Sequence, residues 1–315
     1  MRGQGAFQHA EVAGLVHGAD LSKGDWCPLD GEAFANYVAF YRTGISAHKS
    51  TYGVLEVAED RIFVQLHEPE NPRSWAIVCH GYYDHAGLYA HCVDALLERN
   101  IGVAIFDQIG HGLSSGEPAA IDSFQSYIAV IQRMHRLVKQ VAEGRAIHWL
   151  GQSMGGALIM EYWRQQQDRP SGELMLFAPL VRPYAWSWIR GYFAVVKHFV
   201  QRRPRRMRAD IDDPDFVNLL YKDPLQSQVL PVTWVQAMVD WFTVFERGEV
   251  SDLAPRVIYG YQDKTVDYRH GFRVFDRLYP GAYFRAFPPA HHHLVNEKKE
   301  IRDEFWAWLD QVCEW

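Results

Sequence analysis

One serine stands in a sequence setting typical of a catalytic nucleophile. Ser153 lies in the hexapeptide GQSMGG, residues 151–156, which directly follows the apolar run 147–150 and precedes a helical pattern. This is the Gly-x-Ser-x-Gly motif in the strand-to-helix context that it requires. Small residues are needed at both flanks because the sharp turn that exposes the serine brings neighbouring backbone close. We therefore predict that Ser153 is a nucleophile and not part of an ordinary turn.

A serine hydroxyl attacks well only when a base accepts its proton and a carboxylate orients that base. Two carboxylates follow the β-rich run 256–259, at the strand end where sites in open α/β sheets lie. Asp263 is the predicted acid because it is nearer the strand. Asp267 is the alternative, although it falls in the first turn of the next expected helix. Either could instead be a helix cap.

The predicted base comes from three adjacent histidines, His291, His292 and His293, which follow the last expected strand. They complete the order serine, acid, histidine, but chemistry alone does not choose among them. A metal site is the rival interpretation. Adjacent residues rarely converge on one ion, and no acidic or cysteine cluster accompanies them, so we expect neither a metal nor a cofactor.

The developing negative charge on an acyl oxygen needs hydrogen-bond donors. In a strand–turn–helix site of this kind, one backbone N–H belongs to the residue after the nucleophile. The second comes from the loop after an earlier strand, here HGYYDH, residues 80–85, following the apolar run 75–79. Met154 and Tyr82 are therefore the predicted oxyanion donors.

These residues must be positioned by a larger framework. From residue 53 onward, short β-rich runs alternate with longer helical patterns, which predicts an α/β fold with a mostly parallel sheet and helices on both faces. The expected strands are 53–57, 61–66, 75–79, 103–106, 147–150, 174–177, 256–259 and 283–287. The expected helices include 88–99, 124–141, 154–167 and about 300–312.

The chain is predicted to form one core domain with two additions. Residues 51–180 and 249–315 form the core, and residues 1–50 form an extension packed on it. Residues 181–248 break the alternation, since they hold helical patterns and no convincing buried strand, so we expect a helical cap inserted into the core.

The expected cap helix, 186–201, is aromatic and basic. Apolar residues recur at helical spacing, and Trp186 and Trp188 are among them. Its charged positions, which include Arg190, and the segment after it carry eight basic residues: Arg182, Arg190, Lys197, Arg202, Arg203, Arg205, Arg206 and Arg208. This pattern fits an acyl chain beside an anionic headgroup or membrane, and it equally fits a core-facing helix with a solvated basic face.

Composition excludes some classes of protein. The 315 residues are 48% apolar and 22% charged, as in ordinary globular proteins, and the net charge of −6 argues against a nucleic-acid-binding surface. No apolar run approaches the roughly 18 to 20 residues of a spanning helix, and the first 20 residues do not resemble a signal peptide. Four scattered cysteines favour free thiols in a reducing compartment, so we expect a cytoplasmic protein.

From about residue 53 to the C-terminus, the chain resembles the α/β-hydrolase superfamily and, within it, monoacylglycerol lipases and lysophospholipases. The motifs that carry the resemblance are HGYYDH at 80–85, FDQIGHGLSSG at 106–116, the serine hexapeptide and AHHHLVNE at 290–297. The resemblance implies that the base is His292, four residues before an Asn-Glu pair, and that the acid is Asp263. The motif containing Asp107 and His111 resembles a structural loop of the family. His293 departs from the family pattern, because many relatives carry glutamate there.

The resemblance and the residues together predict a serine-dependent hydrolase that cleaves esters of single-chain lipids through an acyl-enzyme. Its substrate would be a monoacylglycerol or lysophospholipid, and its basic cap could touch an anionic membrane. The residues expected to contact the substrate are His80, Gly81, Tyr83, Gln152, Trp186, Trp188 and Arg190. The alternatives are an esterase for small soluble esters, an aminopeptidase of the same fold, or a non-catalytic member that binds a ligand.

Overall fold

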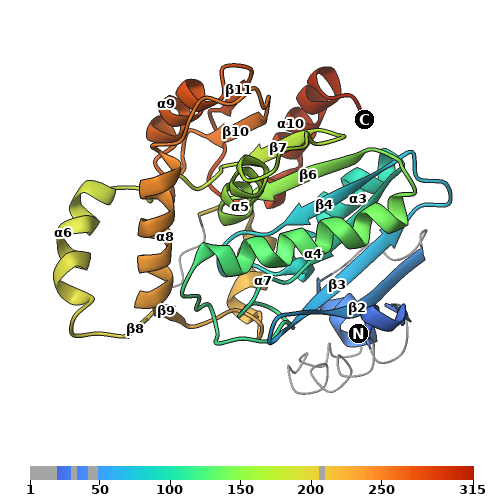
Figure 1. Ribbon diagram of the computed structural model, residues 1–315, viewed down its shortest axis with the longest axis horizontal. Coiled ribbons are helices and arrows are strands. Elements are labelled where there is room, and N and C mark those ends of the chain that lie inside the picture. The colour runs from blue at the N-terminus through green and yellow to red at the C-terminus, as the bar shows by residue number, and fades with distance from the viewer. Residues whose placement is uncertain (1–19, 30–33, 42–48, 206–209) are drawn as a thin grey trace.

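A computed structural model describes residues 20–29, 34–41, 49–205 and 210–315, and its centre is a nine-stranded sheet (Figure 1). The strand order is β1-β2-β3-β5-β4-β6-β7-β10-β11. The bounds are β1 Cys27–Pro28, β2 Lys49–Val57, β3 Asp60–Glu68, β4 Ser74–Cys79, β5 Ile101–Phe106, β6 Ile147–Gln152, β7 Leu174–Phe177, β10 Arg256–Gly260 and β11 Tyr283–Phe287. The strands from β5 onward along this order pair in parallel, and β1, β2 and β3 form an antiparallel edge that joins β5.

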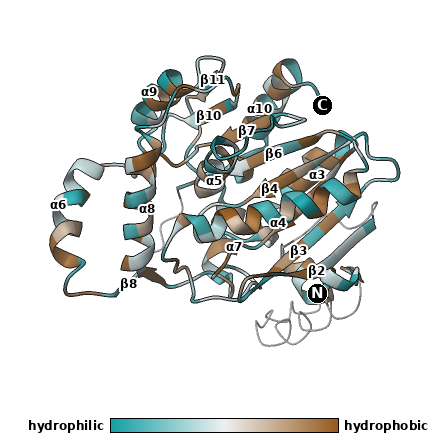
Figure 2. Cartoon of the chain, viewed as in Figure 1, coloured by the Kyte–Doolittle hydropathy of each residue, from teal (hydrophilic) through white to brown (hydrophobic). Residues whose placement is uncertain are grey.

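The central strands are buried on both faces. Every residue of β4, β5, β6 and β7 is buried, which explains why their sequences are mostly apolar and do not alternate with polar residues (Figure 2). Parallel strands need helical crossovers, and these cover the sheet. In Figure 1, α4 and α5 lie over one face and α3 lies behind the strands. The predicted α/β class with a mainly parallel sheet is confirmed.

The helices of the core begin and end close to their predicted bounds. They are α3 Ala90–Glu98, preceded by the 3₁₀ turn Ala86–Tyr89, then α4 Phe124–Ala142, α5 Met154–Arg164 and α10 Lys299–Val312. A further core helix, α9 Tyr268–Leu278, begins directly after Asp267, where the sequence also leads us to expect a helix. The Ser123 hydroxyl caps α4 by accepting from the N–H of Gln125. Arg99, which caps α3, forms a bidentate pair with Asp310 of α10 and thereby ties these two helices together.

The described parts of the first 50 residues pack on the antiparallel edge of the sheet. They include a 3₁₀ turn, Leu21–Lys23, and the helix α2, Ala35–Tyr41. Phe34 and Tyr37 are fully buried, and the Phe34 ring stacks on Phe63 of β3 with ring centroids 5.9 Å apart. Residues 1–19, 30–33 and 42–48 lie outside the described residues.

Residues 181–248, called the inserted segment below, connect β7 to β10. The segment contains α6 Trp186–Val196, β8 Arg202–Pro204, α7 Pro214–Lys222, β9 Val229–Pro231 and α8 Val232–Phe245. Figure 1 shows α8 beside the core and α6 farther out. Two features differ from the expectation: β8 and β9 form a short antiparallel ribbon, and α6 ends at Val196 instead of continuing to residue 201. Arg206 and Arg208 lie outside the described residues.

The carboxyl ends of the parallel strands meet at one edge of the sheet. Cys79 at the end of β4 pairs with Gly151, Gln152 at the end of β6 pairs with Phe177, and Gly260 pairs with Phe287. The loops that carry the predicted site residues therefore converge.

No helix in the described ranges is long and apolar enough to cross a membrane.

Candidate active site

Ser153 lies on a strained turn between β6 and α5. Its backbone has φ 54° and ψ −115°, a conformation that L-residues rarely adopt. Backbone hydrogen bonds hold it there: the Ser153 N–H donates to the carbonyl of Phe177 at 2.8 Å, and its own carbonyl accepts from Leu180 at 3.0 Å. This is the strand-to-helix elbow that the motif predicts, and it exposes the hydroxyl at the sheet edge.

The glycines around Ser153 are required by close backbone contacts. A Cβ on Gly155 would lie 2.0 Å from the carbonyl oxygen of Cys79, and one on Gly151 would lie 2.5 Å from the amide of Gly156. Any larger residue would push α5 away from β4 and β6. The N-terminus of α5 therefore sits directly against the turn, where its dipole favours negative charge.

His292 and Asp263 form a hydrogen-bonded pair beside this turn. His292 Nδ1 lies 2.7 Å from Asp263 Oδ2, and Asp263 is buried. The other carboxylate oxygen of Asp263 accepts from the N–H groups of Thr265 and Val266, which fixes its orientation. The alternative acid, Asp267, is the N-cap of α9 and accepts from the N–H of His270 at 3.0 Å. The geometry thus brings Asp263, not Asp267, to the histidine.

The three adjacent histidines point to three different carboxylates. His291 Nδ1 lies 3.1 Å from Glu297, His292 pairs with Asp263, and His293 Nε2 lies 3.1 Å from Asp84. Side chains that diverge in this way cannot share one ion. Among the described residues, no group of three or more histidine, cysteine, aspartate or glutamate side chains is placed to hold a metal.

Burial alone would lower the pKa of His292. The Asp263 carboxylate, through charge and hydrogen bond, and the charges of Asp210 and Asp84 outweigh burial and raise this pKa above its ordinary value of 6.5. A base must be neutral to accept a proton, so acidification should abolish activity with a midpoint above pH 6.5. The pH dependence of kcat/KM on a soluble ester checks this prediction. An acidic midpoint below pH 6.5 would contradict the assignment of His292.

The two predicted oxyanion donors lie close to the serine. Met154 is the first residue of α5, and neither its N–H nor that of Tyr82 donates to an acceptor in the described part of the chain. The neighbouring N–H of Gly81 is already used, because it donates to the Tyr89 hydroxyl at 2.9 Å. Gly81 lies against the turn, since a Cβ there would be 3.4 Å from Cβ of Ser153.

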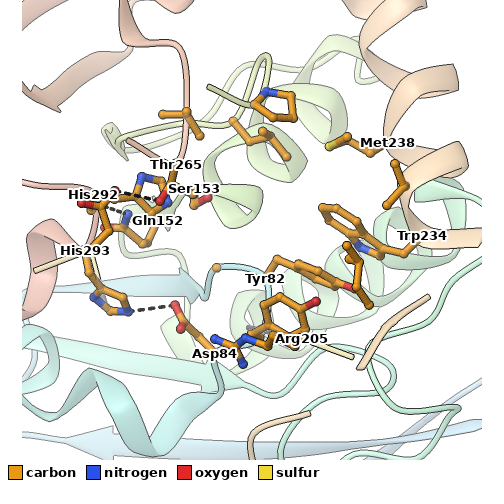
Figure 3. A pocket seen from close by; sticks show the side chains of 18 of the residues that line it. Tyr82, Asp84, Gln152, Ser153, Arg205, Trp234, Met238, Thr265, His292 and His293 are labelled. Atoms are coloured by element: carbon orange, nitrogen blue, oxygen red, sulfur yellow. Dashed lines mark hydrogen bonds and ion pairs between the residues drawn. The ribbon is translucent and has the colours of Figure 1, made fainter. Parts of the chain in front are cut away.

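A cavity of about 550 Å³ opens over Ser153 and His292 (Figure 3). Its volume is in the range of small-molecule sites. The apolar part of its wall comes mainly from side chains of the inserted segment and of the loops after β7 and β10, among them Leu180, Pro183, Trp186, Ile189, Leu220, Leu230, Trp234, Val235, Met238 and Val266. Gly81, Tyr82, Tyr83 and Gln152 also line it, so these residues lie where a bound substrate would be.

Three residues expected to contact the substrate lie outside the cavity. His80 is fully buried, donates from Nδ1 to the Gly81 carbonyl and accepts at Nε2 from the N–H of Gln108. Burial lowers the pKa of His80 to about 3, so it is a neutral structural residue. Trp188 is 86% exposed, and Arg190 is also exposed on α6. Neither Trp188 nor Arg190 lines the cavity, because helical spacing does not tell which face of α6 meets it.

Other lining residues do more than the sequence suggests. The Gln152 amide, expected to contact the substrate, donates to the carbonyl of His292 at 2.8 Å and thus holds the histidine loop. Asp210 contacts the two loops that carry the predicted acid and base. Its carboxylate accepts from the backbone N–H of Lys264 and the hydroxyl of Thr265, and its carbonyl accepts from the N–H of His292. The sequence prediction missed Asp210. The sequence gives one hint of its importance: residues 174–209 contain no aspartate or glutamate, and Asp210 is the first acidic residue after them.

Comparison with known proteins places this geometry in a family. The model of the serine aminopeptidase S33 family matches residues 70–299. A monoacylglycerol lipase of Mycolicibacterium smegmatis is 22% identical over 284 residues, covering 84% of this chain and 98% of the relative. The mouse monoglyceride lipase is 25% identical and covers 75% of this chain and 84% of the relative.

Solved structures agree on the fold. A soluble variant of the monoglyceride lipase from Saccharomyces cerevisiae, in complex with a substrate analog, superimposes with a TM-score of 0.74 at 14% identity. The alignment covers 87% of this chain and 98% of that one. The chain is therefore a serine hydrolase that belongs to the serine aminopeptidase S33 family, within the branch of the α/β-hydrolases that includes the monoglyceride lipases.

Proposed function

We propose that this protein hydrolyses the ester bond of single-chain lipids, with monoacylglycerols as the preferred class, and that Ser153, His292 and Asp263 carry the reaction. The observation that carries the proposal is the largely apolar cavity of about 550 Å³ whose wall includes Ser153 and His292. It suits an acyl chain whose carbonyl carbon rests beside the serine hydroxyl.

The reaction would proceed in two steps. His292 removes the proton of Ser153 as the hydroxyl oxygen attacks the ester carbonyl, and it then protonates the departing alcohol. The resulting acyl-enzyme is cleaved by a water molecule that the same histidine activates, which frees the acid and regenerates the serine. Asp263 holds Nδ1 of His292, so that Nε2 is the atom available for proton transfer.

The tetrahedral intermediate of each step carries a negatively charged oxygen. The backbone N–H groups of Tyr82 and Met154 would bind this oxygen, aided by the N-terminus of α5. Removing one such donor typically lowers the rate by about 100- to 1000-fold. Because both donors are backbone groups, their contribution is tested through the residues that position them.

An aminopeptidase would need a free carboxylate to bind the substrate's ammonium group. Two carboxylates line the cavity, and each already accepts hydrogen bonds at its Oδ2 atom. Asp84 accepts from the Tyr89 hydroxyl and pairs with His293, while Asp210 accepts from the backbone N–H of Lys264 and the hydroxyl of Thr265. The apolar wall and the existing contacts of both carboxylates favour an acyl ester over a peptide N-terminus.

A substrate panel tests this proposal. Purified enzyme is assayed with monoacylglycerols, lysophospholipids, p-nitrophenyl acetate and aminoacyl amides, with Ser153→Ala as the blank. We expect the highest kcat/KM on a monoacylglycerol and no turnover of the aminoacyl amides. Higher kcat/KM on lysophospholipids would move the assignment to that class, and preference for the aminoacyl amides would overturn it.

We also propose that α6 contacts an anionic membrane surface. This helix and the turn after it expose Trp188, Tyr192, Val195 and Phe199, with Trp188 and Phe199 more than four-fifths exposed. Arg190, Lys197 and Arg202 are exposed beside them. Apolar side chains flanked by cations are typical of helices that lie in a membrane interface. Such a contact would bring the cavity mouth to its lipid substrate.

The membrane contact predicts a specific defect. Trp188→Ser combined with Arg190→Ala and Lys197→Ala should weaken binding to vesicles that contain phosphatidylserine, at about 1 kcal/mol for each cation removed. Turnover of p-nitrophenyl acetate in solution should not change, since none of these side chains lines the cavity. Vesicle sedimentation measures the binding. Unchanged binding would remove the membrane proposal and leave the esterase proposal intact.

A further inference from the structure

Residues 82–85 are called the oxyanion loop below. The side chain of each of these four residues contacts a residue from another part of the chain. The loop follows β4 and carries the N–H of Tyr82. The contacts are Tyr82 with Trp234, Tyr83 with Arg205, Asp84 with His293, and His85 with Asp223. Three of these four partners belong to the inserted segment, which otherwise forms the cavity wall. The fold thus joins the substrate-binding part of the molecule directly to the loop beside the serine.

The two aromatic contacts are close. The rings of Tyr82 and Trp234 stack with centroids 3.5 Å apart and planes 12° from parallel. The guanidinium carbon of Arg205 lies 3.7 Å from the centroid of the Tyr83 ring, well within cation–π distance. Figure 3 shows Arg205 and Trp234 around Tyr82 at the cavity wall. These contacts restrain the side chains on both sides of the peptide bond that joins Tyr82 to Tyr83.

The backbone of the oxyanion loop needs this restraint. Tyr83 has φ 72°, in the left-handed region that a bulky residue adopts only when its surroundings hold it there. This strained residue directly follows Tyr82, whose N–H is the proposed oxyanion donor. Relaxation of Tyr83 to an ordinary backbone conformation would rotate the peptide group between Tyr82 and Tyr83. The Tyr82 backbone would have to adjust in turn, and this adjustment would shift its N–H, which lies in the preceding peptide group.

Arg205 is itself firmly anchored in the inserted segment. Its Nη1 donates to Oε1 of Gln226 at 2.7 Å and to the carbonyl of Ser227 at 3.2 Å. At the end of the oxyanion loop, the His85 ring and the Asp223 carboxylate of the inserted segment form a fully buried pair at 2.9 Å. The Tyr41 hydroxyl donates to the other oxygen of Asp223. The inserted segment therefore holds the oxyanion loop at both Tyr83 and His85.

We propose that the inserted segment positions the oxyanion hole, with Arg205 as the positioning residue that keeps Tyr83 in its left-handed conformation. This inference rests on the proposed function, because it takes Tyr82 as an oxyanion donor. It implies that the segment contributes to the chemical step and not only to substrate binding. Any displacement of Arg205 when the segment moves would then lower catalytic power even for a substrate that never touches the segment.

The experiment compares Arg205→Ala in two backgrounds, wild type and Tyr83→Gly, with p-nitrophenyl acetate as a short, neutral substrate. In the wild-type background, kcat should fall roughly 10- to 100-fold, as expected for a misplaced oxyanion donor, with KM unchanged. Glycine adopts positive φ without cost, so Arg205→Ala should cause a much smaller further loss in the Tyr83→Gly background. Lys222→Ala, which removes an exposed cation of α7, is the matched control and should keep full kcat.

Three results would overturn the inference: full kcat in Arg205→Ala, an equal loss in both backgrounds, or a rise in KM alone. The last would mean that Arg205 contacts the substrate. Thermal melting checks that each variant is folded, and Trp234→Leu, which removes the stacking partner of Tyr82, should reproduce the fall in kcat if Arg205→Ala is unstable. Ser153→Ala separates the two proposals. Turnover of p-nitrophenyl acetate that survives this change contradicts the proposed function. If turnover depends on Ser153 but Arg205→Ala keeps a normal kcat, only the positioning role of Arg205 is contradicted.

Discussion

Ser153→Ala should reduce kcat on any ester substrate on the order of a millionfold, which is the size of effect seen when the nucleophile of a serine–histidine–acid triad is removed. The loss should fall on kcat and leave binding of a non-reactive lipid analogue intact, since the hydroxyl contributes little to the apolar cavity. Initial rates of wild type and variant on p-nitrophenyl acetate, measured at the same pH, provide the comparison.

Structural damage is a small concern for this change. Ser153 is positioned by backbone hydrogen bonds to Phe177 and Leu180, and alanine keeps both of them. An unchanged melting temperature together with the loss of turnover would isolate the chemical role of the hydroxyl. A variant that is folded and retains a tenth or more of the wild-type kcat would exclude Ser153 as the nucleophile.

Asp263→Asn is predicted to have the second-largest effect, a fall in kcat of about 10⁴-fold. Asparagine fits the same space, but its amide can stabilise the wrong tautomer of His292 and cannot balance the positive charge that forms on the ring. The present pair is close, at 2.7 Å between Nδ1 and Oδ2, so loss of the carboxylate removes its orienting partner directly.

Asp267→Asn is the matched control for this second prediction. It makes the same chemical change four residues away, at the N-cap of α9, where asparagine caps about as well as aspartate. We expect wild-type kcat and a nearly unchanged melting temperature. Loss of activity in Asp267→Asn with activity retained in Asp263→Asn would reverse the assignment of the acid.

The core of the fold could be predicted because strands that are buried on both faces have short, mostly apolar sequences that are easy to recognise. The strands β4 to β7 are mostly apolar runs, and the turn around Ser153 needs glycines because a Cβ at Gly151 or Gly155 would lie 2.0 to 2.5 Å from neighbouring backbone atoms. By contrast, β8 and β9 have three residues each and pair only with one another. Such short segments have no periodicity that distinguishes them from loops.

Some residues of the candidate site could likewise be predicted from local sequence, and others could not. Ser153 and Asp263 follow strands and could be found from their positions, whereas the choice of His292 among three histidines depended on a family resemblance. The partners Asp210, Arg205 and Trp234 reach the site through contacts between residues that are 54 or more positions apart in the chain, and local patterns do not encode such contacts. The misassigned residues on α6 illustrate the same limit, since an aromatic helix has apolar groups on two faces.

Covalent labelling followed by mass spectrometry tests the central claim most directly. A long-chain alkyl fluorophosphonate mimics the acyl ester and leaves a stable adduct on an activated serine. We predict one adduct per chain, on the peptide that contains Ser153, with loss of turnover in proportion to labelling. An adduct on another residue, or full labelling without loss of activity, would contradict the assignment of Ser153 as the nucleophile of this enzyme.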